Sequence, residues 1–203
     1  MRSRAWRLLG GRMVGASAAG ILVGWMACCG ALAEPVLKVG LRFYEVTGNS
    51  ATGLRAQLDR LGPVSKSGRR FDGRTDWEVR WNYSYLDSAG GCRIDGVTLA
   101  VNVVFTLPRW STAMAAPPVL RQRWGAYLEA LQQHEDGHRD IALAAAREIE
   151  LEIRALSQNR LPCAALPATI DALGRRILGK HQSADDEYDA RTRHGAVQGA
   201  VFP

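Results

Sequence analysis

Three stretches in the first half of the chain alternate between hydrophobic and polar residues, which is the pattern of a half-buried β-strand. Residues 36–46 (VLKVGLRFYEV) alternate and are rich in β-branched and aromatic residues. Residues 77–85 (WEVRWNYSY) alternate most regularly, and residues 92–106 place large apolar side chains on one face. A glycine-bearing turn at 87–91 (DSAGG) joins the last two stretches, so we predict that they form an antiparallel hairpin.

A short helix and a loop are predicted between the first strand and this hairpin. Leu54, Leu58 and Leu61 mark one face of the helix, which the Gly-Pro pair at 62–63 ends. Residues 64–75 are polar, glycine-bearing and basic, which predicts an exposed loop. The basic side chains of this loop are expected to be solvated, and the alternative is that they bind an anion.

The second half of the chain has the period of amphipathic helices. A long helix is predicted from about residue 119 to residue 156, with an apolar stripe in which two histidines fill the gaps. The stripe comprises Leu120, Trp124, Tyr127, Leu131, Ile141, Ala145, Ile149 and Ile153, with His134 and His138 between them. Residues 157–163 (SQNRLPC) turn the chain, and a second helix starts near Pro167. Its inner stripe comprises Leu166, Ile170, Leu173, Ile177, His181, Asp185 and Tyr188.

These two helices are predicted to pack as an antiparallel hairpin. If the turn is centred near residue 161 or 162, residues whose numbers sum to about 323 lie opposite one another. His138 then faces Asp185, and His134 faces Asp189. The predicted fold class is therefore α+β: a small antiparallel sheet of about three strands and a short helix, packed on a long C-terminal helical hairpin in a zincin-like arrangement.

The first 33 residues are predicted to be a signal peptide. Four arginines precede an apolar run at 13–32, the leader ends in Ala-Leu-Ala, and we expect cleavage before Glu34. A lipid-attached form, through Cys28 or Cys29, and an uncleaved anchor are the alternatives. Residues 34–203 are then expected to be a single domain that is periplasmic or secreted, with no stable membrane insertion after the leader is removed.

The charge balance changes when the leader is set aside. The chain has 26 basic and 20 acidic residues, and the leader holds four arginines and no acids, so 22 basic residues (26 less four) remain and the net charge falls from +6 to +2. So small a net charge requires neither nucleic acid nor an anionic membrane as a partner.

Two of the four cysteines, Cys92 and Cys163, also remain after the leader. An even number of cysteines in an oxidising compartment predicts that they form a disulfide. Zinc ligation by the two thiolates is the alternative, which the absence of a second Cys or His at short spacing disfavours.

The long helix contains the motif H-E-x-x-H, formed by His134, Glu135 and His138. Histidines at i and i+4 share one helix face, so two imidazole nitrogens can converge on one zinc ion. A glutamate beside that metal can take a proton from a zinc-bound water and pass it to a leaving amine. Core histidines satisfied by hydrogen bonds are the alternative, but three inward titratable groups are costly to bury unless a metal compensates them.

A catalytic zinc site needs a third protein ligand. Asp189 satisfies the geometry of the helical hairpin, whereas His194 is chemically the commoner donor. The sequence leaves these two open, with Asp185 and His181 as weaker candidates. Tyr188 is either a hydrogen-bond donor to a tetrahedral oxyanion or a core tyrosine.

Several segments resemble a known family. HEDGH (134–138), YDARTRHG (188–195) and QGAVFP (198–203), together with the WEVRWNYSY strand, Cys92 and LPRW (107–110), are similar to the bacterial family of predicted secreted zinc-dependent proteases catalogued as domain of unknown function 922. The resemblance covers nearly the whole chain after the leader. It implies an exported metallopeptidase domain in which His134, His138 and either Asp189 or His194 hold the metal, with Glu135 as the base.

Two functions from different classes are expected. The first is a zinc-dependent endopeptidase or amidase that acts on a peptide or protein substrate in the bacterial envelope. The second is a non-catalytic envelope protein that keeps the helical hairpin as a binding or assembly module, with a structural or vestigial metal site. By analogy with zinc peptidases that carry this helix motif, the substrate backbone pairs with an edge strand, either 92–106 or the strand before it.

Overall fold

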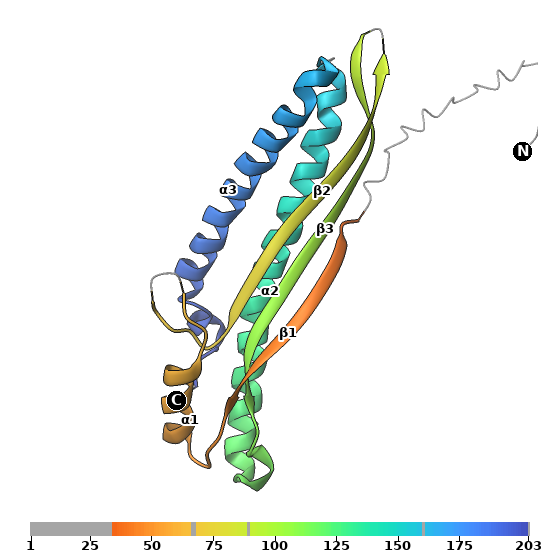
Figure 1. Ribbon diagram of the computed structural model, residues 1–203. Coiled ribbons are helices and arrows are strands. Elements are labelled where there is room, and N and C mark those ends of the chain that lie inside the picture. Colours follow the sequence, from red (N-terminus) through yellow and green to blue (C-terminus); the bar gives the residue numbers. More distant parts are fainter. Residues whose placement is uncertain (1–33, 66–67, 89, 160, 203) are drawn as a thin grey trace, which may run out of the picture. The chain divides into compact units, whose positions relative to one another are not determined.

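Three strands and three α-helices form the fold in the computed structural model, which describes residues 34–65, 68–88, 90–159 and 161–202 (Figure 1). The strands are β1 (Val36–Val46), β2 (Arg74–Ser88) and β3 (Gly91–Trp110). The helices are α1 (Ala51–Leu61), α2 (Pro118–Ala155) and α3 (Leu166–Thr192). These elements confirm the predicted strands and helices, although β2 and β3 extend beyond the residues that alternate most clearly. Short 3₁₀ helices lie at Ala113–Ala115, Leu156–Asn159, Cys163–Ala165 and Ala196–Gln198.

The predicted signal peptide and its cleavage site lie outside the described residues. The residues that the structure describes belong to one compact unit. Among them, no helix has the length and apolar character needed to cross a membrane.

The sheet is mixed, with strand order β1-β3-β2. The predicted hairpin is confirmed, because β2 pairs antiparallel with β3. The prediction of a wholly antiparallel sheet is wrong, because β1 pairs parallel with β3. Alternation in the sequence specifies which residues share a face but not the direction of a neighbouring strand. Here β3 lies between the two earlier strands and is the central strand of the sheet. Of the two strands considered for substrate binding, residues 92–106 therefore do not form an edge, whereas β2 does.

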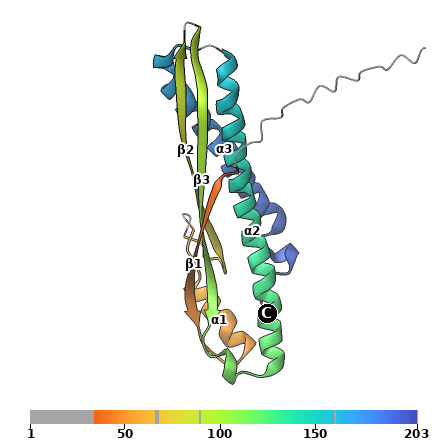
Figure 2. The ribbon, with the colours of Figure 1, turned by 90° about the vertical axis from the view of Figure 1, so that its right-hand side faces the viewer.

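The helices lie on one face of the sheet, and α2 and α3 run side by side (Figure 2). Alternate residues of β3, from Val97 to Phe105, are buried in the core between sheet and helices. The apolar stripe of α2 drifts by one position relative to the prediction, so that Ala142 is buried and Ile141 is only half-buried. A repeat of 3.6 residues per turn produces this drift between His138 and Ala145.

The predicted disulfide between Cys92 and Cys163 is confirmed, with an S–S distance of 2.04 Å. It joins the start of β3 to the turn between α2 and α3, where the Cys92 backbone N–H also donates to the Leu161 carbonyl at 2.9 Å. The tip of the β-hairpin is therefore tied covalently to the turn of the helical hairpin.

Candidate metal centre

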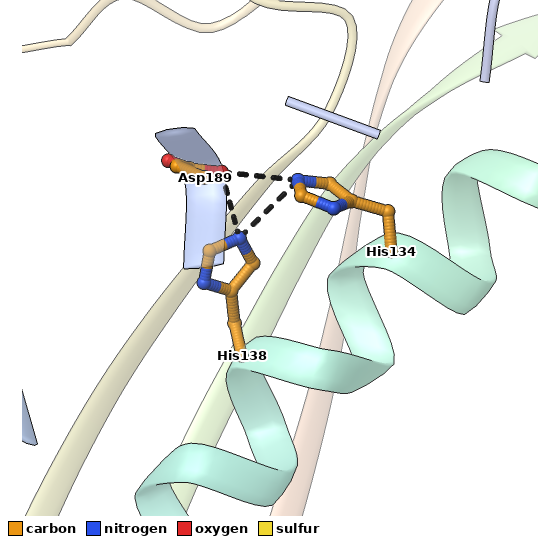
Figure 3. Close-up of side chains that lie close together, drawn as sticks. All are labelled: His134, His138 and Asp189. Carbon is orange, nitrogen blue, oxygen red and sulfur yellow. Dashed lines mark hydrogen bonds and ion pairs between the residues drawn. The ribbon is translucent and has the colours of Figure 1, made fainter. Parts of the chain in front are cut away.

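His134 and His138 point from α2 toward Asp189 of α3 (Figure 3). Both histidines are buried, and their Nε2 atoms lie 3.3 Å apart. The Oδ1 atom of Asp189 is 3.1 Å from Nε2 of His134 and 3.2 Å from Nε2 of His138. The helical hairpin thus has the predicted register, since His134 meets Asp189 and the Nδ1 atom of His138 meets Asp185.

The three convergent atoms have the spacing of corners of a metal coordination tetrahedron. Ligand atoms that bind a tetrahedral zinc at about 2.0–2.1 Å lie about 3.3 Å from one another. The three distances between His134 Nε2, His138 Nε2 and Asp189 Oδ1 run from 3.1 to 3.3 Å. Among the described residues, the His, Cys, Asp and Glu side chains that could bind one metal ion together are these three, whose ligand atoms all lie within 4.8 Å of one another.

Both imidazole rings are oriented by hydrogen bonds at their other nitrogen. The Nδ1 atom of His138 lies 2.8 Å from Oδ1 of Asp185, and that of His134 lies 3.0 Å from Oε1 of Gln198. Both partners are acceptors, so each ring can donate from Nδ1 and leave Nε2 facing Asp189. Each Nε2 atom then either donates a hydrogen bond to that carboxylate or, when it carries no proton, offers its lone pair to a metal ion, and this arrangement of outer partners is typical of metal-binding histidines.

The charges of the site favour a positive charge at the same point. Burial lowers the pKa of His138, but the hydrogen bonds to Asp185 and Asp189 outweigh burial and raise the pKa to about 10. Burial raises the pKa of Asp189, but the hydrogen bonds from His134 and His138 outweigh it and hold the pKa below its usual range. The site therefore stabilises either a proton or a metal cation between these side chains.

The other candidates for a third ligand occupy different positions. His194 lies beyond Asp189, with its Nδ1 atom 3.2 Å from Oδ2 of that carboxylate and its ring against Phe71. His181 bonds to Glu148 at 2.8 Å, and Asp185 contacts the outer nitrogen of His138. Of the two residues that the sequence left open, the structure brings Asp189 together with both histidines.

Glu135 lies beside the histidines with only 2% of its surface exposed. Its Oε2 atom accepts a hydrogen bond of 2.6 Å from the Thr75 hydroxyl. An added Cβ on Gly73 would lie 2.5 Å from the Oε1 atom of Glu135, so only glycine leaves room for the carboxylate here. Burial raises the pKa of Glu135, and the hydrogen bond from Thr75 opposes that rise.

The segment that holds Glu135 is anchored by Asp72. The Asp72 carboxylate pairs with Arg55 of α1 and accepts a 2.8 Å hydrogen bond from the Tyr127 hydroxyl of α2. Its carbonyl accepts a hydrogen bond of 2.7 Å from Tyr44 of β1. The prediction of an exposed loop over residues 64–75 is therefore wrong at its C-terminal end, where Gly73 is buried and β2 has already begun at Arg74.

Tyr188 packs against the site from α3. Its ring stacks on His134, with centroids 5.1 Å apart, and its hydroxyl donates to the His134 carbonyl at 3.1 Å. Gln198 donates to the same hydroxyl at 3.1 Å. Because the hydroxyl is bonded to the backbone of α2 and Tyr188 does not line the cavity at the site, its contacts are those of a residue that orients His134.

The end of α3 returns the chain to His134. Arg193, His194 and Gly195 all have left-handed backbone conformations, with φ of 52°, 51° and 82°. An added Cβ on Gly195 would lie 3.0 Å from Cγ of His134, so glycine permits the close approach. This turn brings Gln198 to Nδ1 of His134, a role that the sequence reasoning missed.

A cavity of about 830 Å³ is lined by the two histidines, Glu135 and Asp189. Its other walls come from the segment between α1 and β2, from the start of β2 and from α3 and the turn after it. Both basic and acidic side chains line the cavity, and Arg74 pairs with Asp76 at 2.6 Å; the other charged residues of the walls are Arg70, Arg193, Asp185 and Asp186. A polar chain segment therefore has room to lie beside the candidate metal ligands.

Comparison with known proteins found no match among curated proteins and none among solved structures. The family model described as bacterial protein of unknown function (DUF922) matches residues 41–195. That span includes the two histidines, Glu135, Asp189 and the residues that orient them, apart from Gln198. The chain belongs to this bacterial family.

Proposed function

We propose that this protein is an exported zinc-dependent metallopeptidase with a zincin-like site, which hydrolyses a peptide or amide bond of an envelope substrate. The observation that carries this proposal is the convergence of His134 Nε2, His138 Nε2 and Asp189 Oδ1 within 3.3 Å of one another. Three protein ligands leave a fourth corner of the tetrahedron for water or substrate, as in catalytic zinc sites.

His134, His138 and Asp189 would hold the metal, and Asp185 and Gln198 would fix the orientation of the two rings. A bound zinc ion supplies Lewis acidity, which lowers the pKa of a water molecule and polarises a carbonyl group. His194, bonded to the other oxygen of Asp189, holds that carboxylate in place. The donor set of two imidazoles and a carboxylate suits zinc, although cobalt or manganese can occupy the same donors.

Glu135 is the proposed general base. It follows His134 in the helix, and its carboxylate lines the cavity that contains the three ligands. The Thr75 hydroxyl holds one of its oxygens and Gly73 leaves room for the other, so the carboxylate is oriented before a substrate arrives. Burial raises its pKa, which brings its proton affinity closer to that needed to take a proton from water and give it to a leaving amine.

Strand β2 is the proposed edge for the substrate backbone. In the described part of the chain β2 pairs only with β3, and its first residues, Arg74 to Asp76, line the cavity. An extended peptide can add to such an edge through backbone hydrogen bonds. The Thr75 hydroxyl on this strand bonds to Glu135, so a peptide on β2 would lie beside the base.

The disulfide supports export, because disulfides persist in oxidising compartments and are rare in the cytoplasm. It agrees with the leader expected from the sequence and with a periplasmic or secreted location. The proposed partner is accordingly a peptide or protein of the envelope, and nothing in the site calls for nucleic acid.

Metal analysis followed by digestion of a broad peptide library tests this proposal. We expect the wild type to retain zinc and to cleave library peptides, and Glu135→Gln to retain zinc but to lose cleavage. Glu129→Gln, an exposed glutamate on the same helix, is the matched control and should cleave as the wild type does. Zinc in all three proteins without cleavage by any would instead identify a non-catalytic binding or assembly module.

A further inference from the structure

Strand β1 carries a row of apolar side chains that the helices leave uncovered. Leu37, Val39, Leu41 and Phe43 are 40%, 52%, 58% and 47% exposed. Their ladder partners on β3 are Val101, Val103, Phe105 and Leu107, all of which are buried. Paired residues in a ladder point to the same side of a sheet, so the row continues the core-facing surface of β3 beyond the reach of the helical layer.

The outer edge of β1 is also open. The strand pairs with β3 on one side, and no described strand pairs with its other side (Figure 1). It is 11 residues long and carries no proline. Proteins usually protect such edges with charges, bulges or covering segments, because unpaired backbone groups recruit further strands. A long edge with exposed apolar residues therefore indicates an interaction surface.

The opposite face of β1 carries two exposed cations between residues 36 and 42, whereas Tyr44 and Val46, further along the same face, pack in the core. Lys38 and Arg42 lie four residues apart, so they share this face. In the described structure neither side chain has an ion pair or a hydrogen bond. The single acidic residue of the strand, Glu45, lies on the apolar side and pairs with Arg109. A strand added to the open edge would thus place one row beside apolar side chains and the other beside two unpaired cations.

We propose that β1 is a docking edge for an extended segment of another protein, in which apolar residues alternate with acidic ones. Backbone hydrogen bonds would add this segment to the sheet as a fourth strand. Its apolar residues would cover the row from Leu37 to Phe43, and its acidic residues would pair with Lys38 and Arg42.

A second copy of the chain fits this edge poorly. Two β1 strands paired with each other would gather both copies of Lys38 and Arg42 on one face, and no acidic residue of β1 lies on that face. Like charges on neighbouring strands are destabilising. The site is also separate from the proposed active site, since no residue of β1 lines the cavity.

Fluorescence anisotropy with two labelled peptides of 11 residues tests the proposal on the full chain. The first peptide alternates valine with glutamate, and the second alternates valine with lysine. We expect saturable binding of the glutamate peptide and binding of the lysine peptide weaker by about fivefold or more. The double variant Lys38→Glu/Arg42→Glu should reverse this preference, whereas Arg123→Glu/Arg147→Glu, the same charge change on exposed positions of α2, should leave it unchanged.

Three outcomes would overturn the proposal. The first is that neither peptide binds, and the second is that both bind equally well. The third is that the charge reversal at Lys38 and Arg42 leaves the preference for the glutamate peptide unchanged. Sedimentation velocity over a range of concentrations tests whether a second copy of the chain occupies the edge instead. A dimer that the Leu41→Lys variant no longer forms would assign the edge to a second copy. Thermal melting of each variant verifies that it is folded, and Glu135→Gln should bind the glutamate peptide as the wild type does.

Discussion

Each histidine of the candidate metal centre is oriented by a residue from another element. Asp185 on α3 bonds to His138, and Gln198, after the end of α3, bonds to His134. Without these acceptors the rings could carry the proton on either nitrogen and rotate about the Cβ–Cγ bond. Fixing Nδ1 as the donor leaves both Nε2 lone pairs ready for one metal ion.

Replacing Asp185 by alanine is expected to weaken zinc binding by about 10–100-fold, because such outer partners contribute that much to affinity. Competition with a fluorescent zinc chelator measures the change. The matched control is Asp186→Ala, since Asp186 is the exposed neighbour on the same helix. Equal zinc affinity in the two variants would show that Asp185 does not orient the ligand.

Thr75 acts on the base rather than on the metal. Its hydroxyl donates to the buried carboxylate of Glu135 at 2.6 Å, and a hydrogen bond to a charged group contributes about 1.5–3 kcal/mol. Thr75→Val should therefore lower kcat by roughly tenfold or more while zinc content stays at the wild-type level. Thr75→Ser keeps the hydroxyl and should restore most of the activity. A rise in KM with kcat unchanged would contradict the orienting role.

At the scale of elements, the close packing of α2 and α3 sets the register of the site. Gly137 of α2 lies directly under Tyr188 of α3, and an added Cβ would be 2.2 Å from the tyrosine hydroxyl oxygen. Glycine in a helix interior costs about 1 kcal/mol relative to alanine. Its presence in the middle of α2 is explained by the space that the Tyr188 ring needs.

Two glycines of α2 should therefore respond to alanine in opposite directions. Gly137→Ala should lower the free energy of unfolding and weaken zinc binding, because Tyr188 must move. Gly125→Ala, where an added Cβ meets nothing within 4 Å, should raise the free energy of unfolding by about 0.5–1 kcal/mol. Urea unfolding of both variants measures this difference. Stabilisation of both proteins would mean that Tyr188 does not pack on Gly137.

How far the sequence predicts the fold depends on whether a feature is periodic. The α2–α3 register followed from helix period and a short turn, so Asp185 and Asp189 could be assigned to their histidines. The direction of β1 could not, because alternation is the same in parallel and antiparallel strands. Thr75 and Gly73 lie where a loop becomes a strand, before regular alternation starts at Trp77. Their contact with Glu135 depends on tertiary packing alone.

At the scale of the whole molecule, residues from the start of β2 and from both long helices line one cavity. The sheet supplies Thr75, α2 supplies the histidines and Glu135, and α3 supplies Asp189. Helix α1 and β1 act at a distance, through the contacts of Arg55 and Tyr44 with Asp72. Conservative changes in these supports should alter the position of Glu135 before they alter the metal ligands.

Metal content of purified variants tests the central claim most directly. Inductively coupled plasma mass spectrometry should find about one zinc per chain in the wild type and in His194→Ala, and little in His134→Ala, His138→Ala or Asp189→Ala. Circular dichroism verifies that each variant remains folded. Full retention of metal in all four variants, or loss in His194→Ala with retention in Asp189→Ala, would contradict the ligand set of His134, His138 and Asp189.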